Sequence, residues 1–166
     1  MSGAVPFAAQ RGPFAGTPEH LDAPFWTTPE PVVERMLDLA QVGPGDHLFD
    51  LGCGDGRILL AAARRGARCT GIERDPARIA EAAVAIAAAE AWDRVTLREE
   101  DLFETSLAEA SVVSLYLLPH VNSLLETKLR AELRPGSRVI GHAFPFPNWA
   151  PEREEVLGER RIYLWV

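Results

Sequence analysis

The sequence predicts one α/β domain with a doubly wound, mostly parallel sheet, helices on both faces and an antiparallel strand at the C-terminus. Short apolar runs alternate along the chain with amphipathic helical patterns, which is typical of βαβ units. A glycine-rich segment follows directly after the first apolar run. The length of 166 residues, with 47% hydrophobic and 25% charged residues, suits a single globular core.

The first half of this pattern begins with a helix. Thr28 is predicted to be its N-cap residue, Pro29 its first residue and Glu30 a first-turn acid. An apolar stripe follows at helical spacing, and the glycines and proline at 43–45 end it. The next elements are expected to be a strand over residues 47–51, a helix over 57–65 stopped by Gly66, and a strand over 68–72.

The second half continues the alternation. Asp75 is predicted to cap a helix that begins at Pro76. Further strands are expected over residues 95–98, 112–117, 138–142 and 161–166, with the last one antiparallel. Between 117 and 138 an amphipathic helix should turn Val121, Leu125, Leu129 and Leu133 toward the sheet and leave Glu126, Lys128, Arg130 and Glu132 in water.

The composition and the cysteine content indicate the cellular compartment of the protein. Residues 1–24 are rich in Gly, Ala and Pro and show no signal-peptide pattern, so we expect a flexible segment ahead of a domain over 25–166. No membrane span is expected, since charges interrupt the most alanine-rich stretch, residues 76–92. Cys53 and Cys69 match no zinc pattern. They are interpreted as reduced thiols in a cytoplasmic protein with no bound metal.

The charge pattern gives no strong signal for nucleic acid. The formal net charge is −7, whereas partners bound mainly through phosphates require a basic face. The sequence also lacks a stretch in which aromatic residues are interleaved with Lys and Arg.

The segment from Asp50 to Gly56 is the strongest candidate for ligand binding. Gly52, Gly54 and Gly56, with Cys53 between the first two, allow a tight turn and a close backbone approach to a ligand. Their spacing is G-x-G-x-G rather than the G-x-G-x-x-G of dinucleotide folds. Asp50 would repel a phosphate but accept hydrogen bonds from an ammonium group. An NAD-dependent oxidoreductase is therefore disfavoured.

Acidic residues also end the next two predicted strands. Glu73 lies about twenty residues after the glycines, where an acid in a Rossmann-like fold binds the ribose hydroxyls; its neighbour Arg74 belongs to the same candidate site. Asp101 and the amide of Leu102 follow the third strand and are predicted to bind adenine. Each acid alone has an ordinary interpretation as a solvated charge, so the prediction depends on their ordered spacing.

The block from Asp50 to Asp101 resembles the motifs of class I methyltransferases, and this resemblance implies S-adenosylmethionine as the cofactor. A closer resemblance covers the chain from about Pro24 to its end. It is carried by Pro24-Phe-Trp-Thr-Thr-Pro29, DLGCGDGRILLAAARRGA, DLFETSL, YLLP at 116–119, KLRAELRPGSRVIGHAFPFPNW and IYLW. These segments resemble lysine methyltransferases that modify the ATP synthase c-subunit and adenine nucleotide translocase, and their short prokaryotic relatives.

That resemblance implies a protein substrate and methyl transfer to a neutral lysine amine. The candidate walls of the acceptor pocket are Trp26 and Thr27, Tyr116 to Pro119, and Phe144 to Trp149. Tyr116 could bind the amine and Asn122 could offer a carbonyl oxygen; packing in the core is the alternative for each. Cys53 stands where serine is usual in the family and is interpreted as a packing residue rather than a nucleophile.

Three alternatives share much of this pattern. The first is a methyltransferase that acts on small molecules, and the second is one that acts on RNA, because acceptor specificity depends on short segments of a shared fold. The third is a binding module that retains the cofactor site without catalysis. A damaged glycine loop or a missing Glu73 would indicate that module, and the sequence has neither defect.

Overall fold

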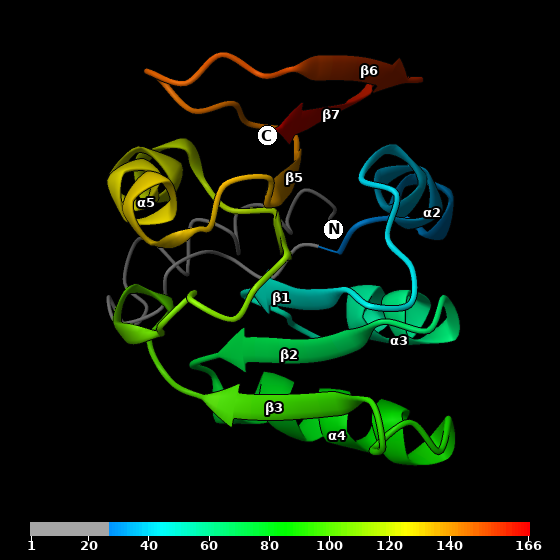
Figure 1. The fold of residues 1–166 in the computed structure, drawn as a ribbon. Coiled ribbons are helices and arrows are strands. Elements are labelled where there is room, and N and C mark those ends of the chain that lie inside the picture. The colour runs from blue at the N-terminus through cyan, green and yellow to red at the C-terminus, as the bar shows by residue number, and fades with distance from the viewer. Residues whose placement is uncertain (1–26) are drawn as a thin grey trace, which may run out of the picture.

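The computed structural model describes residues 27–166, and in this part of the chain it shows a seven-stranded sheet (Figure 1). The strand order is β3-β2-β1-β4-β5-β7-β6. Strands β1 to β5 are parallel, and β7 runs antiparallel to both β5 and β6. The strands are β1 (His47–Leu51), β2 (Arg68–Glu73), β3 (Val95–Glu99), β4 (Val112–Leu115), β5 (Arg138–His142), β6 (Arg153–Leu157) and β7 (Arg160–Trp165). The predicted fold class is confirmed.

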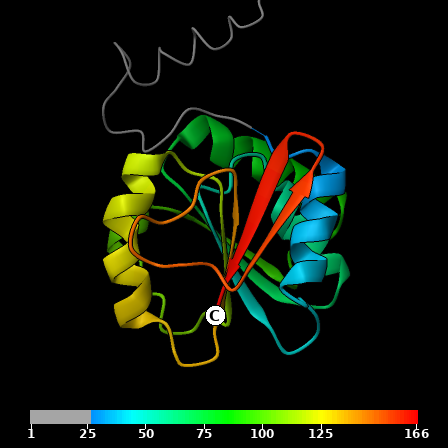
Figure 2. The same ribbon diagram turned by 90° about the horizontal axis from the view of Figure 1, so that it is seen from above.

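Helices cover both faces of the sheet (Figures 1 and 2). On one face lie α2 (Glu30–Leu39), α3 (Arg57–Arg64) and α4 (Pro76–Ala88), and on the other lie α5 (Pro119–Glu132) and the short 3-10 helix η2 (Leu102–Glu104). Each face has its own apolar cluster, one around α2, α3 and α4 and the other beneath α5. The sheet thus separates two core layers.

The helix starts follow from local capping chemistry, with one correction. The carboxylate of Asp75 accepts a hydrogen bond from the Ala77 amide at 2.9 Å and caps α4 as predicted. The N-cap of α2 is Pro29, however, so the prediction that Thr28 caps this helix is wrong. The Thr28 hydroxyl is buried and instead hydrogen-bonds Nδ1 of His142 at 3.0 Å.

Three further details differ from the sequence prediction. Strand β4 ends at Leu115 rather than at Leu117, because the chain turns into α5, which has a proline as its first residue. Strand β6 was not predicted, because its alternation of charged and apolar side chains is weak at an exposed sheet edge. Glu126 is buried rather than solvated, and it accepts a hydrogen bond from the Asn148 amide at 3.1 Å.

Two predictions concern residues without a described structure. The flexible segment over 1–24, with its domain boundary before residue 25, lies outside the described residues, and so does Trp26. Within residues 27–166, no helix combines the length and apolar character needed to cross a bilayer.

Candidate active site

The candidate site lies at the carboxyl ends of β1 and β4. These neighbouring strands are where the strand order reverses, and open α/β sheets bind ligands at such a switch point. Asp50 on β1 is paired in register with Ser114 on β4. The glycine-rich loop follows β1 directly and leads into α3.

The glycines of this loop are required by its backbone. Gly52, Gly54 and Gly56 have φ angles of +81°, +55° and +86°, in the region where side chains with a Cβ are strained. The amides of Gly52 and Cys53 both donate to the carbonyl oxygen of Ile72, at 2.8 and 2.9 Å. A Cβ at Gly52 would lie 3.1 Å from Leu117. The loop is thus hydrogen-bonded to β2 and lies close to the segment after β4.

Asp50 is a buried carboxylate that lacks a cationic partner among the described residues. It is 3% exposed and accepts a hydrogen bond from the Ser114 hydroxyl at 2.9 Å. Burial, together with the negative charges of Glu73 and Asp55, raises its pKa from 3.8 to about 7. Such a group is suited to a ligand that brings a positive charge.

Glu73, the last residue of β2, connects the glycine loop to the start of α4. Its Oε1 accepts from the Gly54 amide and its Oε2 from the Asp75 amide, both at 3.0 Å. Burial raises its pKa, while these amide hydrogen bonds oppose the rise. The side chain is therefore held in place at the edge where the sequence predicts a ribose.

Asp101 follows β3 and Arg74 follows β2, and the two residues link the ends of these strands. Their side chains form an ion pair with an N–O distance of 3.8 Å, and Asp101 also caps η2 by accepting from the Phe103 amide at 2.8 Å. Leu102 is buried beside them. The fold thus places the ends of β1, β2 and β3, with their predicted cofactor residues, along one edge of the sheet.

Both cysteines are free and buried. Burial is the main cause that raises the pKa of each thiol, to about 12 for Cys69, and the nearby carboxylates of Asp50 and Glu73 raise that of Cys53 further. A thiol that resists ionisation is a poor nucleophile, which supports the packing interpretation of Cys53. Among residues 27–166, no group of His, Cys, Asp and Glu side chains could hold a metal ion.

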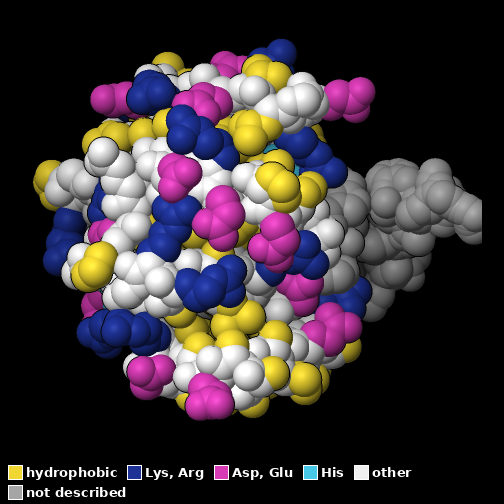
Figure 3. Space-filling view, turned by 90° about the vertical axis from the view of Figure 1, so that its right-hand side faces the viewer, with side chains coloured by type: hydrophobic (Ala, Val, Ile, Leu, Met, Phe, Trp, Pro, Cys, Tyr) yellow, Lys and Arg dark blue, Asp and Glu magenta, His cyan; other side chains and the backbone are white. Residues whose placement is uncertain are grey.

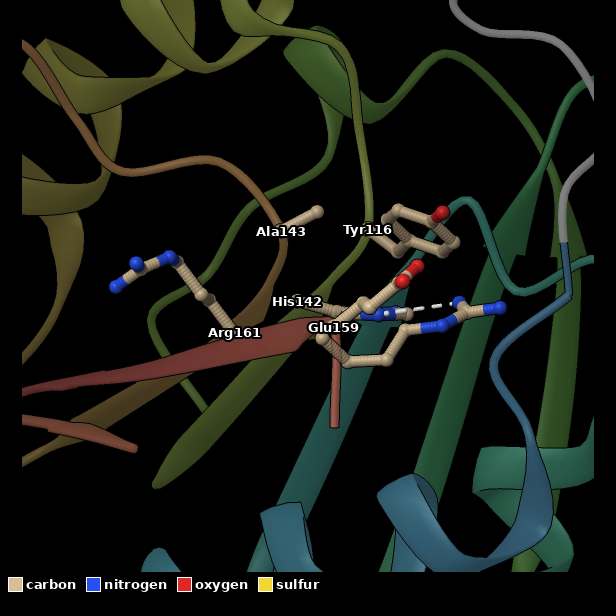
Figure 4. Close-up of a pocket in the computed structure, with 6 residues that line it drawn as sticks. Tyr116, His142, Ala143, Glu159 and Arg161 are labelled. Atoms are coloured by element: carbon tan, nitrogen blue, oxygen red, sulfur yellow. Dashed lines mark hydrogen bonds between the residues drawn. The ribbon is translucent and has the colours of Figure 1, made fainter. Parts of the chain in front are cut away.

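A second feature is a pocket of about 280 Å³ where β4 and β5 end and β7 begins (Figure 4). The Tyr116 ring packs on the buried His142 ring at a centroid distance of 4.0 Å. Burial and the charge of Arg160 lower the pKa of His142 to about 4, so it is neutral. The lining residues are Tyr116, His142, Ala143, Glu159, Arg160 and Arg161.

Only some of the predicted acceptor residues lie at this pocket. Tyr116 lines this pocket, whereas Thr27 is exposed and Pro119 is the exposed first residue of α5. Phe146 and Trp149 do not line it: they pack against each other and against Trp165, with centroid distances of 4.5 to 6.0 Å. These contacts agree with the packing alternative for the two aromatic residues, and their role in binding an acceptor stays a prediction.

The Asn122 side chain makes one hydrogen bond and has one acceptor oxygen without a partner in the described structure. The residue is fully buried, and its Nδ2 donates to the Phe144 carbonyl oxygen at 3.0 Å. Its Oδ1 is buried without a hydrogen-bond partner in the described structure. Asn122 therefore holds the chain where it leaves β5, beside the pocket.

Three of the pocket residues were not identified from the sequence, His142 at the end of β5 and Glu159 and Arg160 of the last hairpin. Their neighbours in space are more than fifteen residues away in the sequence, and without β6 the turn of the hairpin could not be located.

The sheet order, the glycine loop and the acids at successive strand ends define an S-adenosylmethionine-dependent methyltransferase. Comparison with solved structures agrees: an RNA methyltransferase from Salinibacter ruber, in complex with S-adenosylhomocysteine, superposes with a TM-score of 0.83 and 48% identity, covering 84% of this chain and 92% of that one.

Within this class, the chain belongs to the family of the ANTKMT methyltransferase domain, whose family model matches residues 50–153. A protein-lysine N-methyltransferase from Saccharolobus islandicus is 39% identical over 149 residues, covering 86% of this chain and 92% of that protein. The mouse adenine nucleotide translocase lysine N-methyltransferase is 38% identical over 154 residues, covering 92% of this chain and 66% of that protein.

Proposed function

We propose that this protein transfers the methyl group of S-adenosylmethionine to lysine side chains of a protein substrate. The observation that carries the proposal is the similarity to the Saccharolobus protein-lysine N-methyltransferase, which extends over 92% of that enzyme. The site supports it, since Tyr116, which lines a pocket together with His142, is followed directly by Leu117, which lies close to Gly52 of the glycine loop. We further propose that the protein works in a reducing compartment such as the cytoplasm, because both cysteines are free thiols.

The residues at the strand ends fit the cofactor. Asp50, a buried carboxylate with no cationic partner among residues 27–166, would accept hydrogen bonds from the ammonium of the methionine moiety. Glu73 would bind the ribose hydroxyls, and Asp101 with the Leu102 amide would bind adenine. Gly52, Cys53, Gly54 and Gly56 would let the backbone approach the ligand, with Arg74 holding Asp101 in position. When bound, the cofactor supplies an electrophilic methyl group on its sulfonium.

The acceptor side must bind, orient and deprotonate an amine. A lysine amine with a pKa of about 10.4 is protonated at neutral pH, and its ammonium form has no lone pair with which to attack a methyl group. Loss of the proton is favoured in a pocket that excludes water and contains neutral groups. The Tyr116 ring, tilted by 35° on neutral His142, provides neutral groups at the pocket wall. Alignment of the amine with the methyl group is then the main contribution of the protein.

RNA is the second candidate substrate, because the relative from Salinibacter ruber is named an RNA methyltransferase. The face that carries α2, α3 and α4 does not resemble a phosphate-binding surface. Basic and acidic side chains are interspersed on it (Figure 3), and Arg35 and Arg65 there are paired with Asp38, Glu34 or Glu155. A basic stripe, which nonspecific RNA binding requires, is absent from that face.

The acceptor class can be tested by methyl labelling. Purified protein is incubated with radiolabelled S-adenosylmethionine and cell lysate, and the products are divided and treated with protease or ribonuclease. We expect protease-sensitive label that appears as methyllysine after acid hydrolysis. Glu73→Gln serves as the control and should incorporate much less label when the cofactor is kept at a limiting concentration. Ribonuclease-sensitive label with no methyllysine would refute the lysine proposal, and label in small molecules alone would do the same.

A further inference from the structure

Arg160 differs from the other arginines at this edge of the sheet. Arg57, Arg74 and Arg161 are each paired with a carboxylate, of Asp55, Asp101 and Glu154 respectively. No carboxylate of the described residues lies within ion-pair distance of Arg160, although its side chain is half-buried. Its Nη1 lies 3.4 Å from Nε2 of His142, and it also hydrogen-bonds Tyr116. Its partners in the described structure are therefore neutral, and its positive charge is not cancelled.

The pocket that Arg160 lines is linked to the cofactor loop through the segment Tyr116–Leu117. The segment Tyr116–Leu117 separates the loop from the pocket: Leu117 faces Gly52, where an added Cβ would be 3.1 Å away, and Tyr116 packs on His142. Figure 4 shows the Tyr116 ring and the Glu159 carboxylate close to His142, and Arg160 lines the same pocket. Because Arg160 lines this pocket, an amine bound in the pocket would lie near its guanidinium.

The other charged and titratable groups of the pocket come from three segments. Arg161 is paired with Glu154 at 2.5 Å and extends away from Tyr116 (Figure 4). His142 at the end of β5 is neutral, and the pKa of the Tyr116 phenol is raised by burial, so both lack charge at neutral pH. Glu159, in the turn between β6 and β7, is exposed and is the one acid that lines the pocket in the described structure.

We propose that the uncancelled positive charge of Arg160 disfavours protonation of the acceptor amine in this pocket and so keeps that amine in its nucleophilic form. A fixed cation near a lysine amine is a known way to activate it. Glu159 opposes this effect at the pocket mouth, where a carboxylate attracts the protonated amine from solvent. Arg160 thus favours the neutral form of the acceptor amine, and Glu159 attracts the protonated form to the pocket mouth. This inference rests on the proposed lysine methylation.

The reaction balances with these roles. The ammonium releases its proton to solvent before transfer. The amine lone pair then forms the nitrogen–carbon bond while the carbon–sulfur bond breaks, and the sulfur keeps the bonding pair. The positive charge passes from the sulfonium to the methylated amine, which loses a proton before another methyl group can be added. Arg160 keeps its proton throughout and acts only through its charge.

The test is the pH profile of methyl transfer under single-turnover conditions. The acceptor is a protein that the wild-type chain labels on lysine in lysate, and enzyme and cofactor are both saturating, so that the profile reports the bound amine. We expect Arg160→Gln to shift the midpoint upward by on the order of one pH unit. Arg160→Lys should restore the wild-type midpoint, and Glu159→Gln should shift it downward.

The outcomes separate the inference from the function on which it rests. A rate that falls by one factor at every pH in Arg160→Gln, with an unshifted midpoint, would mean that Arg160 is only structural and would overturn the inference. Affinity for S-adenosylhomocysteine, measured by calorimetry, should match wild type in both Arg160 variants and shows that the cofactor half remains folded. If the wild-type chain methylates no lysine at all, the proposed function itself fails.

Discussion

At the scale of single residues, burial of the Asp50 carboxylate costs free energy and also suits this residue to bind a cation. Its carboxylate is 3% exposed and has no cationic partner in the described part of the chain, so burial raises its pKa to about 7. The folded protein therefore carries an unfavourable free-energy contribution at this residue. A bound ammonium would remove it, so the stability of the fold and the affinity for the cofactor are coupled at this residue.

This coupling predicts a pH-dependent effect of Asp50→Asn. The folded pKa of about 7 lies above the ordinary value of 3.8, so the folded protein binds the extra proton, and its stability falls as pH rises between these values. Asp50→Asn should therefore increase the free energy of unfolding at pH 8, by up to about 4 kcal/mol, with little effect near pH 4. Urea denaturation at both pH values measures this.

The matched control is Asp93→Asn, which changes an exposed acid and should leave the stability nearly unchanged at both pH values. The same Asp50→Asn protein should bind S-adenosylhomocysteine more weakly than wild type at pH 8. An equal gain in stability at both pH values would contradict the assigned pKa.

Glu73 gives a second prediction at this scale. Glu73→Gln keeps the size of the side chain but turns one of its two acceptor oxygens into a donor, which would face an amide that also donates. We expect the affinity for S-adenosylhomocysteine to fall by roughly 10- to 100-fold, the value of one or two hydrogen bonds to a charged group. Calorimetry measures it. Glu99, the exposed partner of Glu73 on β3, is the control: Glu99→Gln should bind like wild type.

At the scale of elements, α3 lies close to β2 at Gly71. A Cβ at this position would lie 2.5 Å from the fully buried Leu59 and 2.8 Å from Sγ of Cys53. Gly71→Ala should therefore destabilise the protein by about 1–3 kcal/mol and disturb the cofactor loop through Cys53. Chemical denaturation measures the loss. Gly43→Ala, where a Cβ meets no atom within 4 Å, should be neutral, and equal losses in the two variants would refute the packing argument.

The turn after β5 is a second element under constraint. Ala143 has a φ of +80°, and the Phe144 amide donates to the His142 carbonyl oxygen at 3.0 Å, which is the pattern of a strained γ-turn. Ala143→Gly should relieve this strain and stabilise the protein by about 1 kcal/mol. The midpoint of urea unfolding measures the change. A lower midpoint would indicate that the Ala143 side chain packs favourably enough to outweigh the strain.

At the scale of the whole molecule, cofactor binding should raise the unfolding temperature. A ligand at 100 times its dissociation constant stabilises the folded state by about 2.7 kcal/mol, which corresponds to about 5–10 °C for a domain of this size. S-adenosylhomocysteine should produce this shift in a thermal melt, whereas NADH should produce none, because the glycine loop lacks the dinucleotide spacing. A shift with NADH alone would contradict the assigned cofactor.

The placement of the candidate cofactor residues at successive strand ends was predictable because its signals are local. The apolar run of β1, the glycines at 52, 54 and 56 and the acid at 73 lie within one βαβ unit, where each strand end follows from its own short segment. The acceptor half depends on contacts across long distances in sequence, such as Thr28 with His142 and Asn122 with Phe144. Neither pair has a periodic pattern that could reveal it.

The sequence by itself determined the alternation of strands and helices, the cofactor loop and its acids, because hydrophobic period and glycine geometry act over a few residues. Only the tertiary structure decided that Phe146 and Trp149 pack against Trp165, that Thr28 reaches β5, and that Arg160 has no carboxylate partner among residues 27–166. The physical reason is that burial and charge pairing depend on which strands become neighbours, and β7 pairs with β5 although β6 lies between them in the chain.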